Sequence, residues 1–252
     1  MIFPEDFINK IHLETQCNFE ILKQLPNNSI DLICIDPPYL TTKEKWDKHD
    51  VVTVWLSKEL LRVAKESCSL YIWCGIGEKS QSLIRWFSIF NNDWYFKDLI
   101  TWKKQRGIGV RKGWLYTREE LLWFVKNNKQ FYWNKNEQYG EEKRVYTPNP
   151  KACKSDFKRL TNVWTDINES TLQGKTGQVE IRGHFTPKPI KAIERIIKVS
   201  TKPNDIVLDC FMGSGATALA AKKLNRNFIG MEIYQEYIDT ANKRLMEVDK
   251  NE

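Results

Sequence analysis

The tetrapeptide Asp36-Pro37-Pro38-Tyr39 places an acid, two rigid carbonyls and a flat ring side by side. Proline fixes φ and lacks a backbone donor, so the carbonyl oxygens are held as rigid acceptors. Two acceptors on the hydrogens of a ring-conjugated amine would aim its lone pair at an electrophile. This set suits the exocyclic amine of a base turned out of its stack, with Tyr39 against the base. The alternative interpretation is a proline-stiffened turn with an incidental acid.

A glycine-rich turn, LDCFMGSGAT, occupies residues 208–217. Gly213 and Gly215 let the backbone turn tightly and approach a ligand that a Cβ would block. The sequence lacks both a GxGxxG fingerprint and a GxxxxGK[ST] loop, so a phosphate group is not the expected ligand. A turn that uses glycine for purely geometric reasons is the alternative.

An acid, Glu232, stands at the end of an apolar segment 17 residues after Gly215. At the end of a strand, such a carboxylate can accept the hydroxyl protons of a ribose. An exposed strand-end acid without a ligand is the alternative. Together with the glycine turn, Glu232 indicates a nucleoside-bearing cofactor without a pyrophosphate, and S-adenosylmethionine fits that description.

The elements that must position these motifs alternate between strands and helices. Apolar runs predict strands at 31–35, 69–74, 98–102, 121–125, 206–210 and 228–232, and helical spacing predicts helices at 19–25, 52–65, 80–90, 190–199 and 216–224, with a final helix after 232. This order predicts an α/β fold with a doubly wound, mainly parallel sheet. Both motifs follow strands, where ligands of such sheets bind.

The hydrophobic periodicity breaks down between residues 126 and 182, where Asn, Lys and Gly alternate with isolated aromatics. We therefore predict one catalytic domain in two halves, 1–125 and 183–252, separated by an irregular insert at 126–182.

The basic residues concentrate in the middle of the chain. Residues 101–182 hold 17 Lys and Arg against 9 Asp and Glu, a net charge of +8, whereas the remaining 22 basic and 23 acidic residues sum to −1. A localised positive charge predicts a surface for a polyanion. A solvated basic loop region without a partner is the alternative.

The composition, 41% hydrophobic and 28% charged, is typical of a soluble globular protein. With neither a signal-peptide pattern nor an apolar run of bilayer length, a cytoplasmic protein is expected. The six cysteines form no CxxC pair and only three histidines are present, so we predict neither a disulfide framework nor a metal site.

With DPPY preceding LDCFMGSGAT, the sequence resembles the β class of amino-methylating DNA methyltransferases, in which the catalytic motif comes before the cofactor motif. The resemblance covers nearly all residues and includes FIGMEI at 228–233 and Thr186-Pro187-Lys188-Pro189. It implies a Rossmann-like methyltransferase domain that uses S-adenosylmethionine, with a target-recognition region in the basic middle of the chain.

The resemblance also implies roles for individual residues. The catalytic set is Asp36, Pro37, Pro38 and Tyr39, and the cofactor-binding set is Gln16, Cys17, Asp36, Thr186, Lys188, Asp209, Phe211, Gly213, Ser214, Gly215 and Glu232. Three positions depart from the family pattern, among them Phe185, which stands where the family often has a proline. Gln16 replaces the usual acid near the cofactor adenine, and Pro187 stands where the family often has a glutamine.

The basic stretch at residues 101–182 supplies the predicted contacts with DNA. Candidate phosphate contacts are Lys103, Lys104, Arg106, Arg111, Lys112 and Arg118, and the aromatics Trp114, Tyr116, Phe131, Tyr132 and Trp133 are candidates for stacking on bases. Packing within a small core is the alternative for these aromatics.

We therefore expect a site-specific enzyme that flips a base from duplex DNA and transfers a methyl group directly to N6 of adenine, the base mostly associated with the DPPY form. No Pro-Cys nucleophile motif accompanies DPPY, so no covalent enzyme intermediate is expected. Methylation of N4 of cytosine or of RNA, and DNA binding without catalysis, stay open, whereas a nicotinamide enzyme would need the missing fingerprint. A homodimer and a companion restriction endonuclease also stay open.

Overall fold

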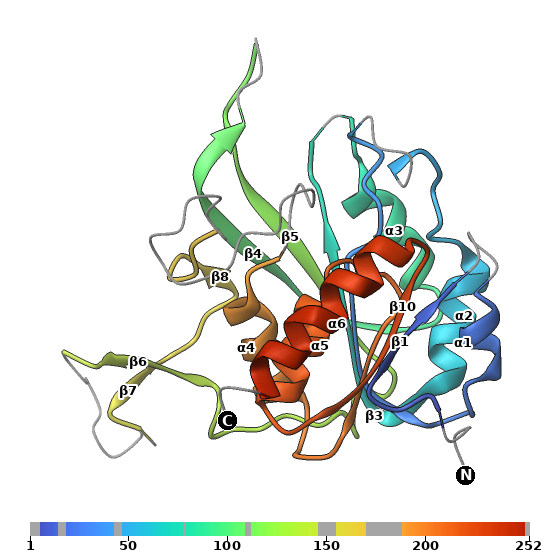
Figure 1. The fold of residues 1–252 in the computed structure, drawn as a ribbon. Helices are drawn as coiled ribbons and strands as arrows, with labels where there is room; N and C mark the ends of the chain where they lie inside the picture. The colour runs from blue at the N-terminus through green and yellow to red at the C-terminus, as the bar shows by residue number, and fades with distance from the viewer. Residues whose placement is uncertain are drawn as a thin grey trace.

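A computed structural model describes residues 6–14, 19–42, 47–77, 79–108, 112–145, 155–169 and 188–249. Its centre is one eight-stranded sheet with the order β1-β10-β9-β2-β3-β5-β4-β8 (Figure 1). These strands are β1 Lys10–Leu13, β2 Ile30–Ile35, β3 Ala64–Cys74, β4 Tyr95–Ile108, β5 Tyr116–Val125, β8 Val163–Trp164, β9 Ile206–Asp209 and β10 Asn227–Glu232. All neighbours pair in parallel except β5, which runs antiparallel to both β3 and β4. The predicted doubly wound, mainly parallel sheet is confirmed.

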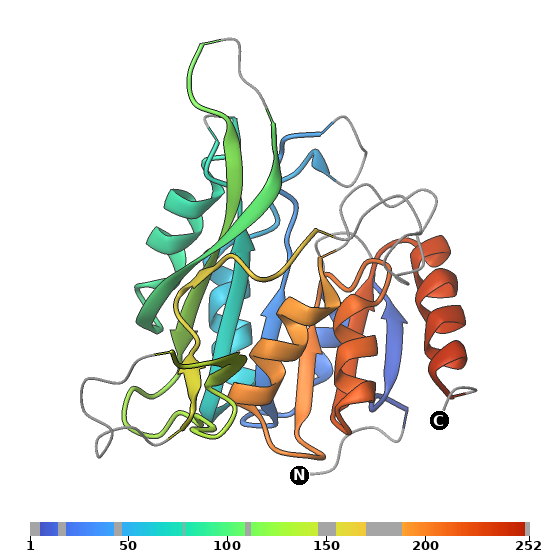
Figure 2. The same cartoon turned by 90° about the vertical axis from the view of Figure 1, so that its left-hand side faces the viewer.

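Helices cover both faces of the sheet (Figures 1 and 2). They are α1 Glu20–Gln24, α2 Val54–Val63, α3 Ser82–Phe90, α4 Ile190–Ser200, α5 Ala216–Lys223 and α6 Gln235–Asp249. The buried side chains form two clusters, one that contains residues of α1, α2 and α3 and one that contains residues of α4, α5 and α6. The strands between them are apolar on both faces, as parallel strands with two helical layers must be. No helix in the described ranges is long and apolar enough to cross a membrane.

The largest difference from the sequence prediction is a long hairpin formed by β4 and β5. The predicted strands at 98–102 and 121–125 extend to 14 and 10 residues, respectively. The added residues are mostly polar or charged because the hairpin leaves the body of the protein, so no buried face marks them in the sequence (Figure 1). The short edge strand β1 was also missing from the prediction.

Within 126–182, the described residues contain three short strands separated by loops. β6 (Tyr139–Lys143) and β7 (Phe157–Arg159) pair with each other, whereas β8 joins the edge of the main sheet beside β4. In both views, the β6–β7 ribbon lies at the end of the molecule opposite the tip of the β4–β5 hairpin (Figures 1 and 2).

The glycine turn between β9 and α5 depends on backbone conformations that favour glycine. Gly213 and Gly215 have φ of 52° and 83°, and Gly215 is the residue at which α5 begins. A Cβ on Gly215 would lie 2.6 Å from the Cβ of Ala241 in α6. The turn therefore needs glycine at 215 both for its left-handed backbone and for the contact with α6.

Gly215→Ala should lower the free energy of unfolding by about 2–4 kcal/mol, because it combines left-handed strain with overpacking. Urea unfolding at fixed pH measures the loss. Gly77→Ala is the matched control, since a Cβ there would meet the Tyr116 ring at an ordinary 3.7 Å. Equal stability of the two variants would contradict this reading of the turn.

Candidate active site

The candidate active site lies at the edge where the parallel strands end. Asp36 follows β2, Asp209 ends β9, Glu232 ends β10 and Glu14 follows β1. Because β5 runs in the opposite direction, its first residues reach the same edge, where Glu120 pairs with Cys74 at the end of β3. The topology therefore gathers carboxylates from distant parts of the chain around one cavity.

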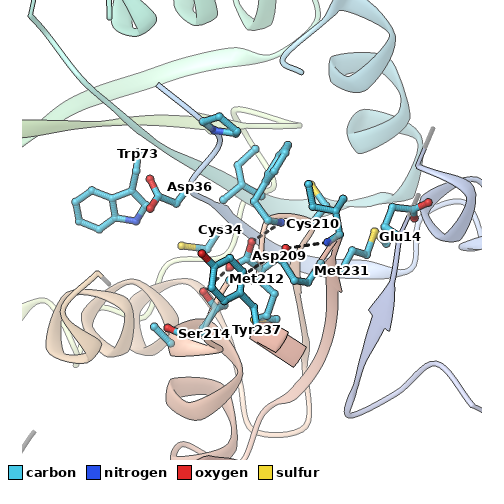
Figure 3. Close-up of a pocket in the computed structure, with 18 of the residues that line it drawn as sticks. Glu14, Cys34, Asp36, Trp73, Asp209, Cys210, Met212, Ser214, Met231 and Tyr237 are labelled. Atoms are coloured by element: carbon cyan, nitrogen blue, oxygen red, sulfur yellow. Dashed lines mark hydrogen bonds between the residues drawn. The ribbon is translucent and has the colours of Figure 1, made fainter. Parts of the chain in front are cut away.

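This cavity has a volume of about 160 Å³ and is lined by residues of both predicted motifs. Figure 3 shows Asp36 and Trp73 at one end, Glu14 at the other and Asp209 between them. The aromatic rings of Phe19 and Phe211 also line it, with their centroids 5.9 Å apart. Apolar walls with several acids suit a ligand that carries a flat ring, hydroxyl groups and a positive charge.

Asp36 forms its ion pair with Lys188, which immediately precedes the first turn of α4. The Lys188 Nζ donates to Asp36 Oδ2 over 2.7 Å, and the Asp36 side chain remains 30% exposed. Burial raises the pKa of Asp36, while the positive charge of Lys188 opposes that rise. Pro38 lines the cavity and Pro37 is buried, so the Asp-Pro-Pro segment is held rigidly where β2 ends.

Tyr39 turns toward the helical layer. Its ring meets Trp86 edge-on, with centroids 5.8 Å apart, and the Lys188 ammonium lies 5.1 Å from its centre. Burial raises the pKa of Tyr39 well above its ordinary value, so the hydroxyl is neutral. Stacking of Tyr39 on an extruded base stays a prediction.

Asp209 organises the glycine turn. Its carboxylate accepts hydrogen bonds from the Phe211 backbone N–H at 2.9 Å and from the Thr217 hydroxyl at 2.6 Å. Burial raises the pKa of Asp209 to about 7, against the lowering effect of these two donors. The carboxylate thus ties the end of β9 to the start of α5.

Glu232 accepts three backbone N–H groups, from Gly213 at 2.8 Å, Ile233 at 2.8 Å and Tyr234 at 3.0 Å. Burial raises its pKa, and these hydrogen bonds oppose the rise. The sequence suggested a direct partner for ribose hydroxyls. The structure shows in addition that Glu232 fixes the glycine turn, which no sequence signal indicated.

Most of the cofactor residues implied by the family resemblance come together at the cavity. Asp36, Lys188, Asp209, Phe211, Gly213, Ser214 and Glu232 line it. Gly215 instead packs against α6, because a side chain at this position would point at Ala241. Gln16, Cys17 and Thr186 lie outside the described residues.

Two carboxylates at the site, Glu14 and Glu119, were not predicted from the sequence. Glu14 lines the cavity and accepts the Glu20 and Ile21 backbone N–H groups at the start of α1, at 2.7 and 3.0 Å. Its position directly after β1 was hidden because that four-residue strand was not predicted. Glu119 is buried beside Lys188 and also escaped notice, because a charged pair in an exposed-looking hairpin gives no signal of burial.

The predicted phosphate contacts differ in their availability. Lys103 and Lys112 are exposed on the hairpin, and the Arg118 side chain is 54% exposed beside Glu120. Lys104 instead pairs with the buried Glu119 and lies over the Trp102 ring. It is held within the protein, so its charge is partly neutralised. The side chain of Arg106 and all of Arg111 lie outside the described residues.

The predicted base-stacking aromatics divide in the same way. Trp114 is 92% exposed in the segment that joins β4 to β5. Phe131 and Trp133 instead pack against Trp123, with ring centroids 5.9 and 5.1 Å apart. Their segment pairs with the amino end of β3 through the Tyr132 N–H, which donates to the Ser67 carbonyl. That end lies roughly 20 Å along the strand from the cavity. Phe131 and Trp133 are therefore part of a local packing cluster far from the cavity.

A comparison with known proteins matches residues 30–243 to the DNA methylase family model of N6 and N4 methyltransferases. The chain is 36% identical to the type II methyltransferase M1.MboII of Moraxella bovis, over 97% of this chain and 99% of that protein. It is 32% identical to the DNA adenine methyltransferase YhdJ of Escherichia coli, over 89% of this chain and 79% of that protein. The solved complex of M1.HpyAVI with S-adenosylmethionine has a TM-score of 0.60 and 28% identity, covering 93% of this chain and 99% of that one.

The fold and the cavity define an S-adenosylmethionine-dependent methyltransferase. The chain belongs to the DNA methylase family of N6 and N4 methyltransferases, and its substrate is DNA. The cavity fits the cofactor, because its acids complement hydroxyl groups and a sulfonium charge, and its aromatic rings suit a purine. When bound there, the cofactor supplies an electrophilic methyl group.

The raised pKa of Asp209 predicts a pH-dependent stability. Between pH 3.8 and about 7, the unfolded chain ionises this carboxyl while the folded protein keeps it protonated, so the free energy of unfolding falls as pH rises. The full cost is roughly 4 kcal/mol and is reached above pH 7.

Asp209→Asn removes this contribution, and the variant should gain stability relative to wild type as pH rises from 4 to 8. Urea unfolding of both proteins across that range measures the difference. A constant difference at all pH values would show that Asp209 ionises normally.

Proposed function

We propose that the chain methylates N6 of adenine in duplex DNA by base flipping and direct transfer. The observation that carries this proposal is the position of Asp36 on the cofactor cavity, next to the rigid prolines. The catalytic Asp-Pro-Pro-Tyr segment, the glycine turn and Glu232 are thereby assigned to one reaction. The relative YhdJ is named as a DNA adenine methyltransferase, and this likeness favours adenine over cytosine, as does the DPPY form of the motif. Methylation of N4 of cytosine remains the second candidate.

The proposed chemistry uses the carboxylate of Asp36 and a proline carbonyl beside it. Asp36 and a proline carbonyl accept the two hydrogens of the amine, which concentrates its lone pair toward the methyl group. The nitrogen then loses one proton, for which the Asp36 carboxylate is the nearest acceptor on the cavity wall. Lys188 donates to Oδ2, so the proposal assigns the amine to the other oxygen, Oδ1.

We further propose that the β4–β5 hairpin contacts the DNA backbone and bases. Lys103 and Lys112 supply exposed charge, and Trp114 supplies a large exposed ring. The hairpin projects from the edge of the sheet at which β2, β9 and β10 end beside the cavity (Figure 1). A relative that is a type II methyltransferase also suggests a role in a restriction–modification system. The 126–182 insert stays a proposed part of target recognition.

Asp36→Ala should lower the single-turnover rate of methyl transfer at least about 100-fold, because it removes the acceptor that activates the amine. The affinity for S-adenosylmethionine should change much less, since most of the cavity remains. Transfer of a labelled methyl group and equilibrium binding measure the two effects. Asp239→Ala, at an exposed position on α6, is the control. Wild-type turnover of Asp36→Ala would overturn the proposed mechanism.

Lys103→Ala should reduce the slope of log affinity against log salt by about 0.9 for any duplex sequence, as expected for one lost phosphate contact. The control is Lys223→Ala, which removes an exposed charge in the last turn of α5, at the end of that helix away from the glycine turn. Fluorescence-anisotropy titrations at several salt concentrations give both slopes. Equal changes in the two variants would remove the hairpin from the DNA interface.

A further inference from the structure

A second buried carboxylate, Glu119, lies close to Asp36. Its side chain is 12% exposed, and its Oε2 lies 3.2 Å from the Lys188 Nζ, which itself contacts Asp36 Oδ2 at 2.7 Å. The ammonium of Lys104 pairs with the other oxygen, Oε1. The four groups therefore form a chain of alternating charge, in the order Asp36, Lys188, Glu119 and Lys104.

Lys188 is enclosed by this environment. Its side chain is 7% exposed, and its ammonium lies 5.1 Å from the centre of the Tyr39 ring and 5.6 Å from that of the Trp73 ring. Little water reaches such an ammonium, so the two carboxylates and the two ring faces determine its position. Without Glu119, Asp36 would be the one charged partner of Lys188 among the residues that the structure describes.

The position of Lys188 determines how Asp36 behaves. An ammonium paired with Asp36 alone stabilises the ionised carboxylate and makes it a weaker proton acceptor. An ammonium shared with Glu119 has less effect, and the negative charge of Glu119 itself opposes ionisation of Asp36. Within the described part of the chain, Asp36 also interacts electrostatically with Tyr39 of its own segment, Cys34 of β2, Cys74 of β3 and Asp209 of β9, and it shares the cavity wall with His49.

We propose that Glu119 is a positioning residue for Asp36: by holding Lys188 from its far side, it divides the ammonium charge between two carboxylates. Asp36 then stays able to accept the proton that the methylated amine must lose. This inference rests on the proposed role of Asp36. In the step concerned, the amine lone pair forms the new N–C bond, the electrons of the S–C bond return to sulfur, and the surplus proton moves from nitrogen to Asp36.

The directions of the pKa shifts agree with this geometry. Burial would raise the pKa of Glu119, but the charges and hydrogen bonds of Lys188 and Lys104 outweigh it and lower that pKa. Burial raises the pKa of Asp36, Lys188 lowers it, and Glu119 raises it further. Burial would lower the pKa of Lys188, but the two carboxylates raise it, so the ammonium stays charged.

Glu119→Gln tests the proposal through the pH dependence of single-turnover methyl transfer, measured at saturating DNA and S-adenosylmethionine. The variant loses the charge that shares Lys188, so the pKa of Asp36 should fall. The acid limb of the profile should move about one unit to lower pH, and the plateau rate should fall about tenfold. General loosening of the site would lower the rate without moving the limb.

Lys104→Met supplies the opposite change and keeps Glu119 in place. Glu119 then lacks its outer partner, draws Lys188 more strongly and repels ionised Asp36. The acid limb should therefore move to higher pH. Glu120→Gln is the matched control, because Glu120 is the adjacent buried acid but pairs with Arg118 and Thr101 instead. Its acid limb should coincide with that of wild type.

Acid limbs that stay within about 0.2 unit of wild type in Glu119→Gln and Lys104→Met, or that move in the same direction, would overturn the proposal. If Glu119→Gln does not fold, as judged by circular dichroism, Lys104→Met decides alone. An acid limb moved to higher pH then supports the proposal, and any other result overturns it. The result is distinguishable from failure of the proposed function. An inactive Asp36→Ala with unmoved limbs overturns only the role of Glu119, whereas an active Asp36→Ala overturns the mechanism itself.

Discussion

Several carboxylates lie at one buried edge of the sheet, and each needs a hydrogen-bond donor or a cation beside it. The partner of each carboxylate determines the local structure of the site. Glu232 takes three backbone N–H groups and Asp209 takes one N–H and a hydroxyl. Each compensation fixes a piece of the glycine turn. Asp36 and Glu119 are instead compensated by ammonium groups: Lys188 contacts both carboxylates, and Lys104 pairs with Glu119.

The order of the strands explains why these acids meet. Parallel strands end at one edge, and the reversal of β5 carries Glu119 to that edge as well. The same reversal makes the β4–β5 hairpin project from the site end of the sheet. One topological feature thus supplies both a buried acid beside the Asp-Pro-Pro-Tyr segment and the exposed hairpin proposed to contact DNA.

Much of this arrangement could be predicted from the sequence, because the buried strands and their flanking motifs carry strong local signals. Asp36, Asp209 and Glu232 each end or follow a predicted apolar run, so their convergence followed from the fold class. Glu119 could not be found in this way, since its burial depends on pairing with residues from β4 and the start of α4. The packing of Phe131 and Trp133 on Trp123 likewise depends on a tertiary contact that no local pattern encodes.

The proposed reaction at this site is methylation of the exocyclic amine of adenine in duplex DNA. It is tested by nucleoside analysis of mixed-sequence duplex DNA after incubation with the protein and methyl-labelled S-adenosylmethionine. Label is expected in N6-methyladenine. Label in N4-methylcytosine would keep the chemistry of Asp36 and contradict the assignment of the base, and label confined to RNA in a parallel incubation would contradict the assignment of duplex DNA.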